Sequence, residues 1–263
     1  MKKMFKNFTS IILSVFLSWQ TFAQDIKTEN FFIEIKNYDI SEILMADNFL
    51  AEDTENEKAK IKRAEMIGFI GTDFQRFFIH FVSIIQNPNN SYEYLVYGKT
   101  KVRETIRSFH GTILINQAEI YKIVDIPGYK QGFANCDVNL YEDNKQSSTG
   151  LIKGYLKSYF LIDTKGKFRY NAISFSADGF SNNQFVGNWT SYKTNISKKC
   201  NWGDYRIPEC DWSNGCDIGA GEFSISDKYL KNGWENYRNA YSLDSNKPES
   251  KKAQKKENEQ WWK

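Results

Sequence analysis

The chain has 263 residues, of which 41% are hydrophobic, 16% aromatic and 25% charged. Its 35 Lys and Arg residues against 32 Asp and Glu residues leave a net charge of only +3. A phosphate-binding face needs a clustered surplus of basic residues, so this balance excludes nucleic acid as a partner. The length is sufficient for one large β domain or two small domains, and it allows a substantial core to be buried.

The N-terminal segment, residues 1–23, is predicted to be a secretory signal peptide. Three lysines precede an apolar run over residues 11–19, and the small residues Thr21 and Ala23 occupy the positions that a signal peptidase reads. The run is too short to cross about 30 Å of hydrocarbon. Because the three charges of this segment are lysines, a mature chain beginning at Gln24 would contain 32 basic and 32 acidic residues. We expect an exported protein, in the periplasm, the cell envelope or outside the cell, with no transmembrane segment after cleavage.

The four cysteines, Cys136, Cys200, Cys210 and Cys216, would enter an oxidising compartment, where pairing is the default. Four cysteines allow three connectivities, and the sequence leaves them open. The turn-forming residues between Cys210 and Cys216 favour a local disulfide there, which leaves Cys136–Cys200 as a long-range disulfide. Structural zinc sites usually pair cysteines two to four residues apart, and none here is that close, so no metal or cofactor is predicted.

The chain before residue 74 mixes several kinds of predicted element. Residues 31–36, rich in Phe and Ile, predict a first strand. The string Asp-Ile-Ser-Glu at 39–42 matches a capping box and predicts a short helix to about Met45. Residues 51–63 carry charges of both signs, which favours an exposed loop or a solvated helix over a docking patch.

From residue 74 onward, aromatic and β-branched residues predict long strands. Residues 74–102 predict a hairpin around an Asn-Pro-Asn-Asn-Ser turn, and residues 104–121 a third strand that bends at Gly111. The first of these strands is apolar on both faces, which suits a strand covered on both sides. Further strands are expected at 134–141, with Cys136 on the buried face, and at 152–162, 167–175 and 184–193, after which the chain becomes irregular.

The C-terminal part predicts short helices followed by disorder. Ser226 can cap a turn that ends before Gly233, and Trp234, Tyr237 and Tyr241 have the spacing of a short amphipathic helix. Evenly spaced strands with one or two short helices predict a mainly β fold, an antiparallel barrel or a sandwich. We expect one domain over residues 24–243 and a polar, disordered tail over residues 244–263.

The string Gly-Asn-Trp at 187–189 resembles the Gly-x-Trp signature of lipocalins and related calycin barrels. In that family the tryptophan closes one end of an antiparallel barrel and an arginine from a late strand packs over it. The resemblance implies a calycin-like barrel with Arg206 or Arg238 over the tryptophan. The position differs, because lipocalins carry the signature on the first strand and about seven candidate strands precede it here.

The string Asn-Trp-Gly-Asp-Tyr-Arg-Ile-Pro at 201–208 is similar to exported β-rich proteins of Gram-negative bacteria, a resemblance that implies a compartment and no activity.

Residues 185–223 are the densest in unusual residues, with three of the four cysteines and three tryptophans. Aromatic side chains stack on sugar rings or line apolar cavities. We therefore expect binding rather than catalysis, with a small apolar molecule or a glycan as the ligand. The alternative interpretation is that the tryptophans fill the core. The candidate ligand-binding residues are Trp189, Tyr192, Trp202, Tyr205, Arg206 and Trp212.

Two other functions stay open. A structural or protein-interaction module of the cell envelope would use residues 51–63 or the polar tail. A carboxylate-dependent hydrolase needs two carboxylates about 5 to 10 Å apart, for which Asp204 and Glu222 are candidates. His80 and His110 are the only histidines, and without a metal-ligand spacing we expect structural or surface roles for both. No catalytic residue is predicted.

Overall fold

The computed structural model of the chain describes residues 27–52, 58–173, 175–210, 213, 216–219, 222–241 and 246–263. The expected signal peptide lies outside these residues. Among the described helices, none is both long and apolar enough to cross a membrane.

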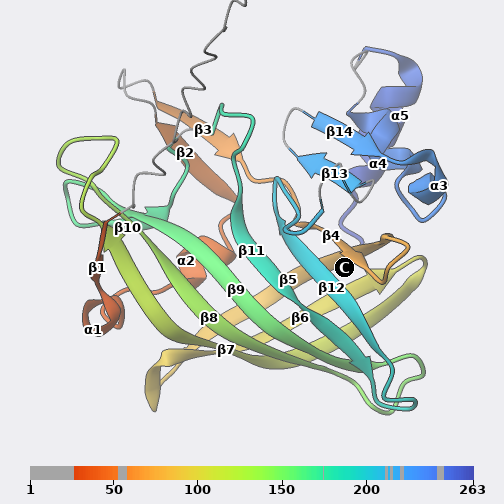
Figure 1. Ribbon diagram of the computed structural model, residues 1–263, viewed down its shortest axis with the longest axis horizontal. Coiled ribbons are helices and arrows are strands. Elements are labelled where there is room, and N and C mark those ends of the chain that lie inside the picture. Colours follow the sequence, from red (N-terminus) through yellow and green to blue (C-terminus); the bar gives the residue numbers. More distant parts are fainter. Residues whose placement is uncertain are drawn as a thin grey trace, which may run out of the picture.

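The main element of the fold is a ring of antiparallel strands. In the described part of the chain eight strands form it: β4 (Ile67–Ile70), β5 (Gln75–Asn87), β6 (Asn90–Val102), β7 (Thr105–Tyr121), β8 (Lys130–Glu142), β9 (Gly150–Ile162), β11 (Asn182–Ser191) and β12 (Ser197–Asp204). Each strand pairs with the next along the chain, and β4 also pairs with β12, so the pairing runs all the way round (Figure 1). The predicted mainly β, antiparallel fold is confirmed, and it is a barrel.

The interior of the barrel is packed with side chains from alternate positions of the strands, which form the main hydrophobic core. Phe185 of β11 stacks on Trp202 of β12, with their ring centroids 3.5 Å apart. Gly154 and Gly187 are paired between β9 and β11, and a Cβ atom at either position would lie 2.7 or 2.5 Å from the Phe185 ring. These glycines therefore make room for the aromatic stack.

The bend expected at Gly111 of β7 lies elsewhere. The register of β7 against β8 shifts between Ile115 and Gln117, whereas Gly111 keeps regular pairing. A Cβ atom at Gly111 would lie 1.9 Å from the carbonyl oxygen of Asn139. The glycine is therefore required by the close approach of β8 and not by a bulge.

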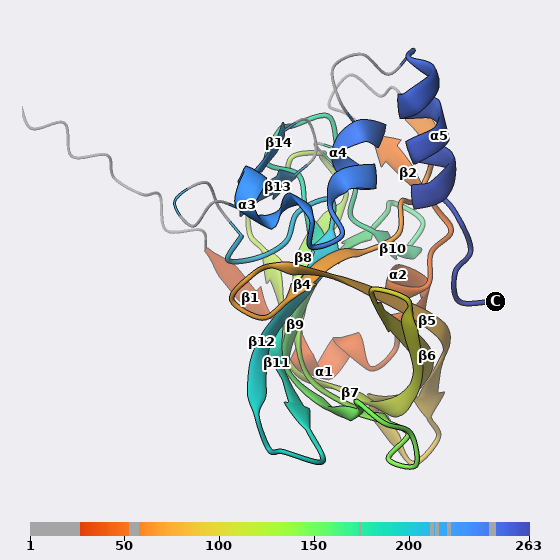
Figure 2. The same ribbon diagram turned by 90° about the vertical axis from the view of Figure 1, so that its right-hand side faces the viewer.

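The N-terminal segment enters one end of the barrel, where Figure 2 shows α1 (Phe32–Ile35) within the outline of the ring. A short strand, β1 (Thr28–Asn30), precedes α1, and α2 (Ser41–Leu44) follows it. The strand predicted at 31–36 is wrong, because Phe31 and Ile35 lie four residues apart and are both buried in the main core, a helical spacing. The Tyr94 hydroxyl fixes this segment: it accepts a hydrogen bond from the Ile40 amide and donates one to the Tyr38 carbonyl, each 3.2 Å long.

The charge-rich segment forms a hairpin, β2 (Asn48–Glu52) and β3 (Lys58–Lys62), where a loop or a solvated helix was expected. Phe49 pairs across the hairpin with Ile61, and both pack against the main core. Phe49 also stacks on Tyr170 of β10 (Phe168–Tyr170), with a centroid distance of 4.9 Å. A few apolar residues thus determine the pairing, and the surrounding charges conceal them in the sequence.

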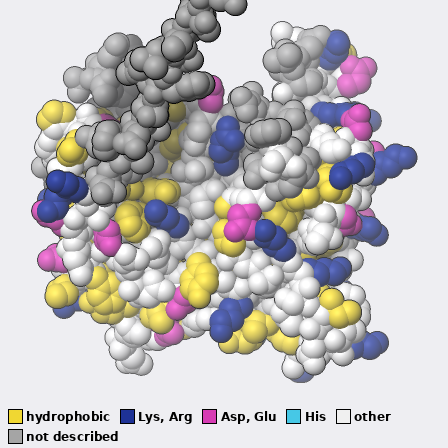
Figure 3. Space-filling model, in the orientation of Figure 1, with side chains coloured by type: hydrophobic (Ala, Val, Ile, Leu, Met, Phe, Trp, Pro, Cys, Tyr) yellow, Lys and Arg dark blue, Asp and Glu magenta, His cyan; other side chains and the backbone are white. Residues whose placement is uncertain are grey.

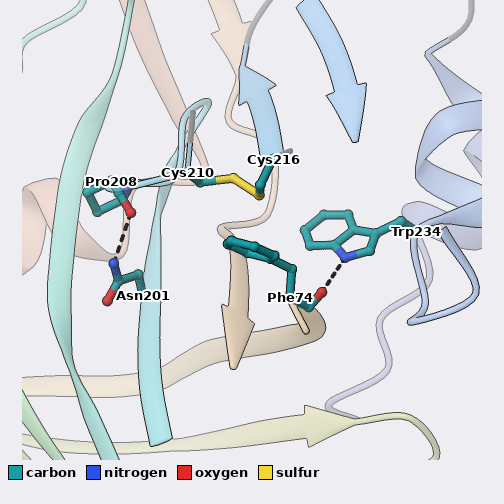
Figure 4. The surroundings of a disulfide bond; sticks show 6 residues. All are labelled: Phe74, Asn201, Pro208, Cys210, Cys216 and Trp234. Carbon is teal, nitrogen blue, oxygen red and sulfur yellow. Dashed lines mark hydrogen bonds between the residues drawn. A yellow bond between two sulfur atoms is a disulfide. The ribbon is translucent and has the colours of Figure 1, made fainter. Parts of the chain in front are cut away.

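A second, smaller core lies on the outer face of β4 and is formed by the C-terminal elements (Figure 4). These elements are β13 (Cys216–Gly219), β14 (Glu222–Ile225), α3 (Asp227–Leu230) and α4 (Glu235–Ala240), and α5 (Pro248–Glu257) packs against α4. Trp234 is fully buried there and donates its indole N–H to the Phe74 carbonyl at 2.6 Å. The helix predicted around Trp234 and Tyr237 is confirmed as α4, and Gly233 before it has a positive φ of 95°.

The cysteines follow the prediction only in part. Cys210 and Cys216 form the predicted local disulfide, which lies beside the second core (Figure 4). Cys136 and Cys200 are both free and fully buried, so the predicted long-range disulfide is wrong. Each of these two residues points into the barrel from its own strand and packs as a small apolar side chain of the main core.

The polar tail differs from the expected disorder, because α5 and the residues after it dock on the barrel. The Arg76 guanidinium lies 4.4 Å from the Trp234 ring centroid and 3.1 Å from a carboxylate oxygen of Glu257 in α5. At the end of the chain Trp262 stacks on His80 of β5, with a centroid distance of 3.7 Å. The tail thus covers part of the outer face of β5, a strand that the sequence predicts to be covered on both sides.

The surface carries mixed charge. On the face shown in Figure 3, Lys and Arg side chains lie among Asp and Glu side chains, and hydrophobic side chains occur between them in small groups. This distribution agrees with the small net charge of the chain.

Candidate functional site

The structure divides the predicted binding residues between the two ends of the β11–β12 pair. Trp189 pairs with Lys198 at one end, and Tyr192 follows on the adjoining turn. Asp204 pairs with Asn182 at the other end, and Tyr205 and Arg206 come directly after it. Seven residues of strand, at about 3.3 Å each, place the two groups roughly 20 Å apart. They therefore do not form one aromatic wall.

Trp202 lies between these two groups and belongs to the core. Its side chain is fully buried against Phe185 inside the barrel, as the alternative interpretation of the tryptophans expected. Trp212 lies outside the described residues. Of the six candidates, Trp189 and Tyr192 are therefore the two that lie together at the end of the barrel opposite α1.

A cavity of about 380 Å³ opens at this end of the barrel. We call it the mouth cavity; its lining residues include Thr100, Arg103, Arg107, Glu142, Trp189 and Lys198. Strand register explains why these side chains meet. Thr100 pairs with Arg107 between β6 and β7, and Trp189 pairs with Lys198 between β11 and β12. Residues paired directly across antiparallel strands project from the same face of the sheet, here into the end of the barrel.

Glu142, at the end of β8, is the central polar residue of the mouth cavity and is only 5% exposed. One carboxylate oxygen accepts a hydrogen bond from the Thr100 hydroxyl at 2.7 Å. The other accepts from the Trp189 indole N–H and from the Gly150 amide, both at 2.9 Å. These bonds compensate the burial of the carboxylate and hold the Trp189 ring in one orientation. Sequence reasoning missed Glu142, because its partners lie on distant strands.

The carboxylate of Glu142 also affects neighbouring groups. Burial, together with the negative charge of Glu142, raises the pKa of Tyr192 above its ordinary value. A tyrosine with an ordinary pKa near 10 is already protonated at neutral pH, so this upward shift changes the charge of Tyr192 only in alkali.

The opposite end of the barrel holds a buried ion pair between Arg63 and Asp204. A guanidinium nitrogen of Arg63 lies 2.8 Å from one Asp204 carboxylate oxygen, and the other oxygen accepts from Tyr170 at 3.0 Å and Asn183 at 2.7 Å. Arg63 also donates to the carbonyl oxygen of Leu44 at 2.7 Å, which ties α2 to the barrel. Burial opposes the charge of Arg63, but attraction to Asp204 and Tyr170 outweighs it and raises the pKa of the guanidinium. Asp204, a candidate acid for hydrolysis, is thus committed to this network.

Tyr205 and Arg206 are also held in structural contacts at that end. The Tyr205 ring makes edge contacts with Phe49 and Phe175, at centroid distances of 6.2 and 5.3 Å. Arg206 donates twice to the carbonyl oxygen of Asp178, at 3.0 and 2.7 Å. The position of Arg206 is far from Trp189, and Arg238 pairs with Asp227 near the C-terminal helices, so neither arginine packs over the tryptophan.

A second cleft, of about 500 Å³, lies between the end of β3, β5 and the C-terminal segment. Its His80 ring stacks on Trp262 and lies 3.1 Å from the Glu65 carboxylate, and its Arg63 is bonded to Asp204. His80, Glu65 and Arg63 of this cleft are thus already engaged by other groups of the protein. Nowhere in the described part of the chain do three or more His, Cys, Asp or Glu residues form a group that could hold a metal ion. Glu222 is described only in its backbone, as part of β14.

The mouth cavity combines a fixed aromatic ring, a buried carboxylate and polar side chains around an opening, an arrangement suited to holding a small polar molecule. Comparison with known proteins adds nothing to this description: no family model, no curated protein and no solved structure matches the chain.

Proposed function

We propose that the chain is an exported binding protein that holds a small glycan in the mouth cavity and does not convert it chemically. The observation that carries this proposal is the hydrogen bond from Trp189 to the buried Glu142, which fixes an aromatic ring beside an open polar cavity. A ring immobilised before binding loses little entropy when a ligand stacks on it.

The lining of the mouth cavity favours a glycan over an apolar ligand. Sugars present an apolar C–H face that stacks on an aromatic ring and hydroxyl groups that need hydrogen-bonding partners. Trp189 supplies the ring, while Thr100, Glu142 and Ser148 line the cavity with hydrogen-bonding groups. Deeper in the barrel, Phe185 and Trp202 occupy the space that a long apolar ligand would need. The volume of about 380 Å³ is near the lower limit of ligand pockets and suits a mono- or disaccharide.

Calorimetric titration of the purified protein with a panel of mono- and disaccharides tests the proposal. Trp189→Ala is expected to weaken binding about tenfold or more, because it removes the stacking surface. Trp189→Phe retains a ring and is expected to retain more of the affinity. The matched control is Trp261→Ala, because Trp261 packs on Phe78 at the outer face of β5 and not at the mouth cavity. Saccharide binding that is unchanged in a folded Trp189→Ala variant, or absent from the native protein, contradicts the proposal.

A second candidate function is a protein-interaction module of the cell envelope. The observation that favours it is a row of exposed apolar side chains on the outer faces of β5 and β6: Val82, Ile85, Leu95 and Tyr97, each 41 to 62% exposed. Ile85 pairs directly with Leu95, so the row is continuous across the two strands. The test is to cross-link the native chain and the Ile85→Lys variant in envelope preparations and to compare their cross-linked products. If the products formed by the native chain are equally abundant in the variant, this surface is not the interface.

A further inference from the structure

Three cationic side chains line the mouth cavity: Arg103, Arg107 and Lys198. Two carboxylates line the same cavity, Glu142 and Asp73, so the cationic side chains outnumber the acidic ones by three to two. Glu142 takes its hydrogen bonds from a hydroxyl, an indole and a backbone amide, and not from the cationic side chains. In the described residues neither arginine forms an ion pair with an acidic side chain. The mouth cavity therefore carries a surplus of positive charge, and its two arginines are available to an anionic group of a ligand.

Arg107 is fixed by backbone carbonyl groups alone. Its Nε and Nη2 atoms donate to the carbonyl oxygen of Ser147, at 2.9 and 2.8 Å, and its Nη1 atom donates to the carbonyl oxygen of Ile106 at 2.8 Å. A guanidinium has five N–H groups, so two remain for a ligand. The carbonyl groups hold the guanidinium plane without cancelling its charge.

Arg103 is fixed through its Nε atom and lies in the turn between β6 and β7. Its Nε donates to the side-chain oxygen of Gln75 at 3.0 Å, and Gln75 is itself buried and donates to the carbonyl oxygen of Asn232 at 2.7 Å. Among the residues that the structure describes, the two terminal nitrogens of Arg103 have no hydrogen-bond partner. A guanidinium anchored at Nε presents its outer N–H groups to solvent, and two such N–H groups match the two oxygens of a carboxylate or a sulfate.

We propose that the mouth cavity recognises an anionic substituent through Arg103 and Arg107, so that its ligands are acidic saccharides, bearing a uronic carboxylate or a sulfate ester. This inference rests on the proposed function, because Trp189 and Glu142 would hold the sugar ring while the two arginines bind its charge. Lys198, paired with Trp189 across the strands, adds positive charge on the side of the ring.

The test compares three ligands by calorimetric titration at fixed ionic strength: methyl glucuronide, methyl glucoside and inorganic sulfate. The affinity for methyl glucuronide is expected to exceed that for methyl glucoside by about tenfold or more. This is the factor that one charge-assisted hydrogen bond contributes. The double variant Arg103→Gln, Arg107→Gln is expected to weaken the binding of methyl glucuronide until this ratio is near one. Arg238→Gln is the control, because Arg238 pairs with Asp227 away from the mouth cavity, and it is expected to keep the full ratio.

The outcomes separate this inference from the proposed function. Equal affinities of the native protein for the glucoside and the glucuronide overturn the acidic specificity and leave glycan binding intact. If sulfate binds as tightly as methyl glucuronide, the proposal that the ligand is a saccharide is overturned, and the cavity is a site for free anions. Failure of both sugars to bind overturns the proposed function itself. A glucuronide preference that survives in the double variant, with the fold verified by circular dichroism, overturns the assignment to the two arginines.

Discussion

At the residue scale, Cys136 and Cys200 show how burial controls chemistry in this protein. Burial, with a contribution from Asp137, raises the pKa of Cys136 to about 12, and burial together with Glu142 raises that of Cys200 well above its ordinary value. Alkylation requires the thiolate. We expect iodoacetamide at pH 8 to leave both residues unmodified in the native protein and to modify both after denaturation without reductant. Peptide mass mapping measures the modification.

The disulfide provides the internal control for this experiment. Cys210 and Cys216 are expected to react only after reduction, because they are bonded to each other. A peptide pair that links Cys136 to Cys200 in the unreduced protein would contradict the structure. Rapid alkylation of Cys136 or Cys200 in the native state would show instead that the barrel opens.

The residues of the candidate site were only partly predictable from the sequence. Trp189 stood out because a tryptophan in a Gly-Asn-Trp string is unusual in a polar stretch. Glu142 gave no signal, because an acidic residue after Tyr141 at the end of a strand reads as an ordinary turn residue. Its role depends on Thr100 and Trp189, which lie 42 and 47 residues away along the chain. Contacts at that separation are set by strand register, which a single sequence does not specify.

At the element scale, Arg63 and Asp204 join the β3–β4 connection to the end of β12. Asp204→Asn is expected to lower the free energy of unfolding by about 3 to 5 kcal/mol, because it leaves the buried Arg63 guanidinium without its counter-charge. Urea-induced unfolding followed by tryptophan fluorescence measures the loss. Arg63→Met added to this variant is expected to restore part of the stability, since a buried charge is then removed.

The control for this prediction is Asp227→Asn. Asp227 pairs with Arg238 at an exposed position, where an ion pair contributes little. A loss in Asp204→Asn no larger than in Asp227→Asn would show that the buried pair does not hold β12 to the rest of the barrel.

The predictability of the elements follows from how their residues are buried. The hairpin of β5 and β6 was predictable because long runs of aromatic and β-branched residues flank a clear turn. β12 was missed because its first three residues, Ser197, Lys198 and Lys199, are exposed and polar, and all its residues from Cys200 onward are buried, so no alternation marks the strand. The helix α5 was missed because its attachment depends on Arg76, more than a hundred residues earlier, and not on its own composition.

At the scale of the whole molecule, the choice between barrel and sandwich depended on one pairing. β4 and β12 close the ring through contacts such as Ile67 with Gly203, which lie far apart in the chain. Antiparallel alternation is the same in both architectures, so the sequence could indicate the class of fold and not its closure. The filled interior restricts a ligand to the ends of the barrel, which is why the site lies at the mouth cavity and not deeper.

The packed interior also predicts how the whole protein responds to alkali. Burial is the main cause that raises the pKa of Tyr94, Tyr121 and Tyr205 from 10.0 to about 12, and that of Cys136 from 9.0 to about 12. The fold thus favours the neutral form of each group, and the stability that this preference contributes is complete below about pH 9 and is lost as the pH rises towards 12. We expect the urea midpoint to be level from pH 7 to 9 and to fall between pH 10 and 12.

In Tyr94→Phe this fall should be shallower, because one of the titrating groups is absent, although the starting stability is lower without its hydrogen bonds to Ile40 and Tyr38. A midpoint that stays level to pH 12 would mean that these side chains titrate alike in the folded and unfolded states, which requires the ends of the barrel to admit water.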